Sequence, residues 1–70
     1  MLRVYKICLD NQITFCELAS YLNCSYMLVG NMLKMKQDIS LDYLKKIKNF
    51  LVSRNIISSD CDLGYLLDIV

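Results

Sequence analysis

The chain has 70 residues, of which 56% are hydrophobic, and its eight basic and seven acidic residues give a formal net charge of +1. This length predicts one domain, spanning residues 1–70, and leaves no room for a second. No apolar run approaches the roughly 20 residues of a membrane-spanning helix, and charged residues interrupt the N-terminus where a signal peptide needs a long apolar segment. We therefore expect a soluble, cytoplasmic protein without a membrane partner.

The helical spacing of apolar residues recurs along the chain, whereas the two-residue alternation of a strand never persists. The first predicted helix covers about residues 2–10 and the second about residues 14–21. Thr14 and Glu17 have the spacing of a capping box, in which each side chain binds the backbone amide of the other residue. Asn23 follows the second helix and tolerates the left-handed backbone of a tight turn.

The third and fourth helices are expected over about residues 26–36 and 41–54, with Ser25 and Ser40 as their N-caps. In the fourth helix, apolar residues spaced by three and four positions predict one buried face, made by Leu41, Leu44, Ile47 and Leu51.

A short fifth helix is expected over about residues 60–68, capped by Ser58 or Ser59. Asp60 and Asp62 would lie in its first turn, where the helix dipole favours negative charge. The sequence therefore predicts an all-α fold, a compact domain of five helices.

The residues needed for catalysis and metal binding are scarce. The chain has no histidine, no phosphate-binding glycine loop and no C-x-x-C pair among its cysteines, which are Cys8, Cys16, Cys24 and Cys61. A cysteine without a neighbouring base is a poor nucleophile, and structural zinc sites usually show closely spaced ligand pairs. We expect no enzyme activity, no metal and no cofactor, and reduced cysteines that act as small hydrophobic side chains.

The charges are unevenly distributed. Residues 34–54 carry a net charge of +4, whereas residues 55–70 carry −3. A basic central segment is typical of a phosphate-facing surface. For the lysines of the fourth helix, an ordinary solvated helix face explains the charge equally well; these are Lys45, Lys46 and Lys48.

A helix-turn-helix requires a small residue where its two helices cross and apolar residues between them. Ala19 is the small residue, and the apolar set is Leu18, Leu22, Cys24, Val29 and Met32. With these features, residues 14–44 resemble the phage repressor and Cro-like (XRE-type) helix-turn-helix family without a gap. The positions in family register are the Leu18–Ala19 pair, Ser25, Val29 and the Ser40–Leu41 helix start.

The resemblance implies a five-helix repressor-like domain in which the second and third helices form the helix-turn-helix. It implies a sequence-specific transcriptional regulator that binds a short double-stranded operator, usually as a homodimer, in a bacterial or phage-infected cell. The chain departs from the family where Phe15 replaces a frequent glutamine and Leu33 a frequent glutamate. Asn23 and Met35 stand where glycine is common.

If the third helix enters the major groove, its outward residues meet base edges. These residues are Tyr26, Met27, Gly30, Asn31 and Lys34. The Asn31 amide can pair with adenine, Lys34 can reach guanine or phosphate, and Met27 can pack on a thymine methyl group. Gly30 would allow close approach of the backbone or is simply tolerated at an exposed position. Phosphate contacts are expected from helix N-termini and the loop after the third helix, at Thr14, Phe15, Ser25, Lys36 and Gln37.

A second hypothesis is a protein-binding module, such as a phage-type inhibitor or antirepressor, that uses the apolar face of Tyr26 and Met27. Further apolar residues belong either to an exposed surface or to core and dimer packing: Tyr5, Leu9, Leu33, Met35 and Tyr65. The apolar content exceeds what so small a core hides, which favours a homodimer. Its predicted interface is the fifth helix, with Tyr65, Leu66 and Ile69.

Overall fold

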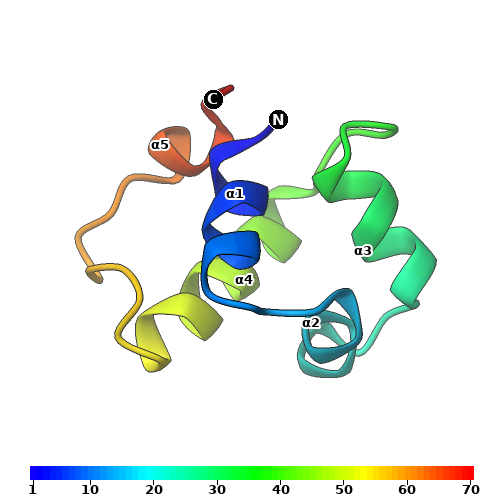
Figure 1. The fold of residues 1–70 in the computed structure, drawn as a ribbon, viewed down its shortest axis with the longest axis horizontal. Coiled ribbons are helices and arrows are strands. Elements are labelled where there is room, and N and C mark those ends of the chain that lie inside the picture. Colours follow the sequence, from blue (N-terminus) through cyan, green and yellow to red (C-terminus); the bar gives the residue numbers. More distant parts are fainter.

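Five helices and no extended sheet make up the chain in a computed structural model, which describes residues 1–70 (Figure 1). In chain order they are α1 (Arg3–Asp10), α2 (Phe15–Leu22), α3 (Tyr26–Leu33), α4 (Leu41–Ser53) and α5 (Leu63–Leu67). The expected all-α class is therefore confirmed. None of the five helices combines the length and the apolar content needed to cross a membrane.

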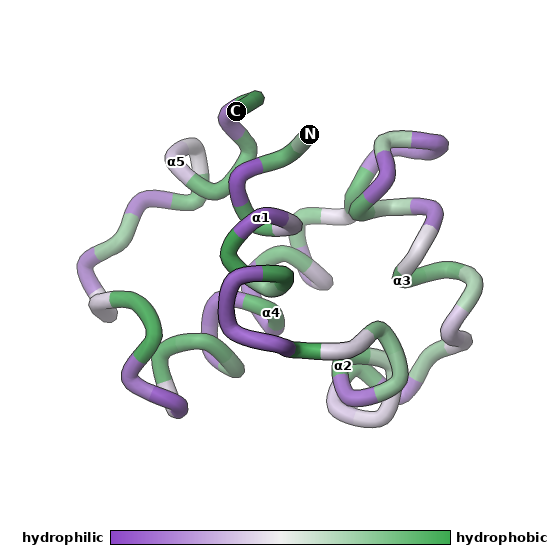
Figure 2. Tube along the Cα trace, viewed as in Figure 1, coloured by the Kyte–Doolittle hydropathy of each residue, from purple (hydrophilic) through white to green (hydrophobic).

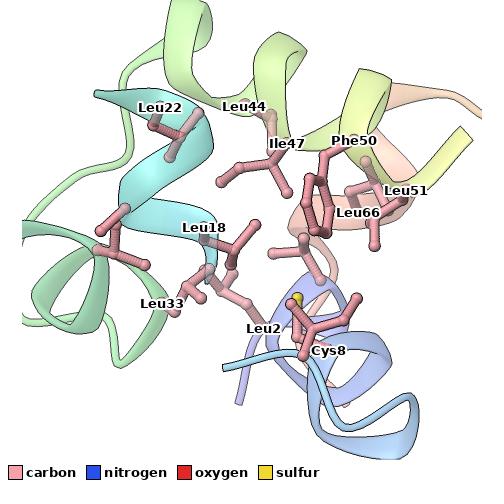
Figure 3. Packing of buried hydrophobic residues seen from close by; sticks show 14 residues of the cluster. Leu2, Cys8, Leu18, Leu22, Leu33, Leu44, Ile47, Phe50, Leu51 and Leu66 are labelled. Carbon is pink, nitrogen blue, oxygen red and sulfur yellow. The ribbon is translucent and has the colours of Figure 1, made fainter. Parts of the chain in front are cut away.

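One hydrophobic core joins all five helices. Leu18 of α2, Leu33 of α3 and Leu66 of α5 are all fully buried, and they belong to one cluster with the buried side chains of α4 (Figure 3). Full burial of a leucine side chain contributes about 1.5–3 kcal/mol before the entropic cost of folding is counted. The buried residues of α4 are Leu44, Ile47, Phe50 and Leu51.

The start of α2 and the start of α3 are both fixed by side-chain caps. At Thr14 the predicted capping box is confirmed, since the Glu17 amide donates to Thr14 Oγ1 at 3.1 Å and the Thr14 amide donates to Glu17 Oε1 at 3.5 Å. At Ser25 the Leu28 amide donates to Oγ at 3.1 Å. Asn23 between them is left-handed, with φ 56°. The sequence predicted all three features because each depends on neighbouring residues.

The ends of α1 to α4 share one geometry. Within two residues of each helix end one residue is left-handed, and its amide and the next amide donate back into the last turn, as in a Schellman motif. For α3, the Lys36 amide donates to the Asn31 carbonyl at 2.8 Å and the Met35 amide donates to the Met32 carbonyl at 3.2 Å. The left-handed residues are Gln12, Asn23, Met35 and Asn55, and none of them is glycine.

This geometry corrects the predicted end of the third helix, which stops at Leu33 rather than at residue 36. Met35, with φ 64°, turns the chain out of the helix. The left-handed position at this helix end therefore carries a methionine rather than a glycine. For an L-residue, this backbone region costs roughly 1–2 kcal/mol.

We expect Met35→Gly to raise the free energy of unfolding by about 1 kcal/mol, because glycine adopts positive φ without a steric penalty. Little apolar burial is lost, since the Met35 side chain is exposed. Urea denaturation followed by circular dichroism measures the change. Met27→Gly, inside the same helix, is the control and should lower stability by about 1 kcal/mol. A Met35→Gly protein that is no more stable than the parent contradicts this account of the helix end.

The fifth helix begins at Leu63, not at residue 60, and ends at Leu67. Asp62 is its N-cap, and its Oδ1 accepts from the Gly64 amide at 3.1 Å. The predicted serine caps and the predicted first-turn position of Asp60 are therefore wrong. Ser58 Oγ instead accepts from the Asp60 amide in the preceding turn, because short polar side chains compete for nearby backbone amides.

Two positions differ from expectation in their burial, and one differs in its capping. Leu41 is 57% exposed, because it is the first residue of α4 and the buried stripe begins only at Leu44. Leu33, considered for an exposed surface, is 0% exposed. Ser40 occupies the predicted N-cap position of α4, but its side chain makes no capping hydrogen bond.

The two ends of the chain pair with each other. Leu2 and Ile69 form an antiparallel bridge, and Arg3 binds Asp68 at 3.1 Å while its guanidinium lies 4.0 Å from the Tyr65 ring centroid. Leu66 is fully buried. It therefore belongs to the core and not to the dimer surface predicted for the fifth helix, although Tyr65 and Ile69 are exposed.

Candidate nucleic-acid interface

Helix α3 lies at one side of the molecule, and Figure 1 shows it across the view while α2 is seen end on. Its inner side packs on α2 and the core through Val29, Met32 and Leu33. Its outer side exposes Tyr26 (56%) and Met27 (71%). The apolar inner residues therefore hold α3 so that its first turn faces solvent.

The outer side of α3 is hollowed. A depression of about 140 Å³ is lined by Phe15, Tyr26, Met27, Gly30, Asn31, Lys34 and Lys36. All five residues predicted to contact bases line this depression, which we call the α3 hollow. Two residues of the predicted phosphate set, Phe15 and Lys36, also line it. The structure thus brings seven of the ten predicted site residues to one place.

The Phe15 side chain makes contacts that the sequence did not predict. Its ring covers Gly30, where an added Cβ would lie 3.5 Å from two ring carbons. Gly30 is consequently buried, and the prediction of an exposed glycine is wrong. The ring also lies 5.6 Å from the Tyr5 ring and 6.0 Å from the Tyr26 ring, centroid to centroid. Phe15 therefore forms the floor of the α3 hollow and joins α1, α2 and α3.

The charge lining the α3 hollow has a single sign. Lys34 and Lys36 contribute ammonium groups, and no carboxylate lines it. Neither lysine forms a salt bridge, and Lys34 Nζ lies 5.6 Å from the Phe15 ring centroid. Glu17, at the start of α2, is bound by Arg54 at 2.8 Å. The hollow therefore favours a ligand that carries negative charge or hydrogen-bond acceptors.

Among the predicted phosphate-contacting residues, Thr14, Ser25 and Lys36 offer hydrogen-bond donors, whereas Gln37 lies at a separate depression. The hydroxyl oxygens of Thr14 and Ser25 accept from backbone amides, and each hydroxyl keeps a proton to donate to a ligand. Lys36 lies in the hydrophilic loop after α3, visible in Figure 2. Gln37 instead lines a separate depression with Leu2 and Leu67, and the structure does not bring it to the α3 hollow.

A second depression adjoins the first. It has a volume of about 390 Å³, and its lining comprises Tyr5, Leu9, Gln12, Ile13, Thr14 and Phe15. Phe15 belongs to both depressions, so one continuous apolar surface runs from α1 to α3. Sequence reasoning missed this continuity, because it depends on contacts between helices that no local pattern encodes.

Comparison with protein-family models, with curated proteins and with solved structures finds no match to this chain. The function must therefore be argued from the α3 hollow and its surroundings.

The cysteines form no chemical site of their own. All four are free thiols, and no group of histidine, cysteine or acidic residues is arranged to hold a metal ion. Cys16 is exposed, contrary to its expected role as a small hydrophobic side chain, because it lies on the outer side of the first turn of α2. Burial of Cys8 raises the pKa of its thiol from 9.0 to about 11.

This raised pKa predicts alkaline destabilisation. Between pH 9 and about pH 11 the unfolded chain releases the Cys8 proton while the folded chain retains it. The free energy of unfolding should therefore keep the whole Cys8 contribution below pH 9 and fall as the pH rises, by at most about 2–3 kcal/mol. Urea titrations across this pH range measure the slope. Cys8→Ala should reduce the slope, whereas Cys16→Ala should leave it unchanged; equal slopes in all three proteins contradict the assignment.

Proposed function

We propose that this protein is a sequence-specific DNA-binding transcriptional regulator. In this proposal α2 and α3 act as a helix-turn-helix, and α3 enters the major groove. The observation that carries it is the α3 hollow, in which amide, hydroxyl and ammonium groups from the outer side of α3 meet without any carboxylate. Outward side chains of a groove-bound helix are the groups that read base edges.

The polar residues divide into base and phosphate contacts. Asn31 presents one donor and one acceptor, the pair that matches N7 and N6 of adenine, and Lys34 reaches guanine or phosphate. The first two amides of α2 and of α3 precede both the helical hydrogen bonds and the capped amides of Glu17 and Leu28, and they are available to phosphate oxygens. Thr14, Ser25 and Lys36 supply further phosphate contacts beside them.

The proposed binding mode favours A·T-rich sites and moderate affinity. Arginine is the commonest reader of guanine, and no arginine lines the α3 hollow. We further propose that a homodimer binds a two-fold symmetric operator and acts by blocking or recruiting polymerase. The exposed apolar residues at the paired chain ends offer a dimer surface, and these are Met1, Leu67, Ile69 and Val70.

Selection from a random pool of duplex DNA tests the proposal, and a salt titration of the selected duplex follows. Enrichment of a short, roughly palindromic A·T-rich sequence is expected. Its binding constant should fall steeply with salt, with a logarithmic slope near −0.9 for each phosphate neutralised. A pool without enrichment, together with salt-independent binding, contradicts DNA recognition.

A protein-binding module is the second candidate function. It is favoured by the apolar surface that joins the two depressions through Phe15, and by the exposure of Tyr26 and Met27 at its rim. Aromatic residues at such places often dominate the energy of protein interfaces. If Tyr26→Ala abolishes binding of a purified protein partner while Asn31→Ala and Lys36→Ala leave DNA binding unchanged, this candidate replaces the first.

A further inference from the structure

The α3 hollow has an apolar floor inside a polar rim. The floor consists of the Phe15 ring and the Met27 side chain. Gly30 leaves the ring uncovered there, because a Cβ at this position would lie in van der Waals contact with two ring carbons, at 3.5 Å. Asn31 and Lys34 form the rim. A surface built only for hydrogen bonds and phosphate contacts does not need such a floor, so its ligand should carry an apolar group.

The major groove displays one methyl group, the C5-methyl of thymine; cytosine carries only a C–H at the same position, and the other recognition groups are hydrogen-bond donors or acceptors. Polar atoms pressed onto the Phe15 ring would lose water without gaining a partner, which is unfavourable. A methyl group placed on the ring makes no hydrogen bonds with water, so its removal from water is favourable. Among the features of duplex DNA, the floor therefore matches the thymine methyl.

The polar residues of the rim also match duplex DNA, whereas their positive charges do not match an uncharged apolar peptide. Lys34 lies over the Phe15 ring, Lys36 adds a second positive charge, and no carboxylate lines the hollow. Both charges complement a phosphate backbone. Asn31 stands next to the floor along α3, where its amide can bind the adenine of the same or the adjacent base pair.

We propose that the α3 hollow is a receptor for 5-methylpyrimidines, in which Phe15 and Met27 bind the C5-methyl of a thymine while Asn31 binds adenine. This inference rests on the proposed DNA-binding function. It assigns Phe15 to the floor of a base-reading site rather than to a phosphate. It also predicts that thymine is distinguished from uracil, and 5-methylcytosine from cytosine, at one position of each half-site.

The test uses the duplex enriched by selection, with each thymine replaced in turn by uracil, which keeps every hydrogen-bonding group and removes only the methyl. One position in each half-site should show about fourfold weaker binding, equivalent to the roughly 0.8 kcal/mol of one buried methylene or methyl group. At that position Met27→Ala should bring the thymine-to-uracil ratio close to one, and Met27→Leu should retain it. Met27 is 71% exposed, so both variants are expected to fold. Leu41→Ala, at an exposed apolar residue at the start of α4 and outside the α3 hollow, should retain the full ratio.

The outcomes separate this inference from the proposed function. A protein that binds the selected duplex with equal affinity for thymine and uracil at every position overturns the methyl receptor and leaves DNA binding intact. A uracil effect that persists in Met27→Ala also overturns the assignment. If no duplex is enriched and only a protein partner binds through Tyr26 and Met27, both the receptor and the DNA-binding function are wrong.

Discussion

Leu33→Ala is expected to lower the free energy of unfolding by about 2–5 kcal/mol, because Leu33 is 0% exposed and its removal leaves a cavity between α2, α3 and the core. A domain of this size has a total stability of only about 3–5 kcal/mol. The variant should therefore be largely unfolded at room temperature. Urea denaturation or thermal melting followed by circular dichroism measures the loss.

Leu41→Ala is the matched control, since it makes the same chemical change at the end of a helix but at a residue that is 57% exposed. Its effect should stay within about 0.5 kcal/mol. The pair is informative because the sequence pattern placed Leu41 in the core and considered Leu33 for the surface. Similar losses in both variants would contradict the packing of α3 against the core.

Asn31→Ala is expected to relax specificity at one adenine of the selected operator. Loss of a bidentate amide contact costs about 1–3 kcal/mol of discrimination against the wrong base. Affinity for the selected duplex should therefore fall about 5- to 150-fold, while binding to duplexes altered at that base pair changes little. Fluorescence anisotropy with duplexes carrying each of the four base pairs at that position measures the effect.

Two variants separate base reading from phosphate contact. Asn49→Ala removes an exposed asparagine on α4, outside the α3 hollow, and should leave affinity and specificity unchanged. Lys36→Ala should weaken all sequences about equally and reduce the salt slope by about one. If Asn31→Ala also weakens all sequences equally, Asn31 contacts phosphate and another residue reads the base.

The apolar character of the α3 hollow bears on both candidate functions. Tyr26 and Met27 are accessible to DNA and to protein alike. What favours DNA is the chemistry around them, where two unpaired ammonium groups and an amide meet without a carboxylate. The uracil substitution discriminates between the candidates, since a protein interface has no reason to depend on a pyrimidine methyl group.

The sequence by itself determined the features that depend on neighbouring residues. The five helices, the capping box at Thr14, the cap at Ser25 and the left-handed turn at Asn23 all follow from residues within one helical turn of each other. Predictions from the local sequence failed at two helix ends, where a residue other than the expected one set the boundary. Asp62 took the role expected of a serine in capping α5, and Met35 ended α3 early despite not being glycine.

Only the tertiary structure decided which side chains cover one another. The ring of Phe15 buries Gly30 and becomes the floor of the α3 hollow, and Leu33 rather than Leu41 enters the core. Leu2 pairs with Ile69 across the whole length of the chain. Periodicity reports only that one face of a helix is apolar, whereas burial depends on where distant segments come to lie against that face. The base-contacting residues were predicted on α3 and Phe15 only as a phosphate contact, but the ring of Phe15, from α2, joins the apolar floor beside Met27 because the helices pack together.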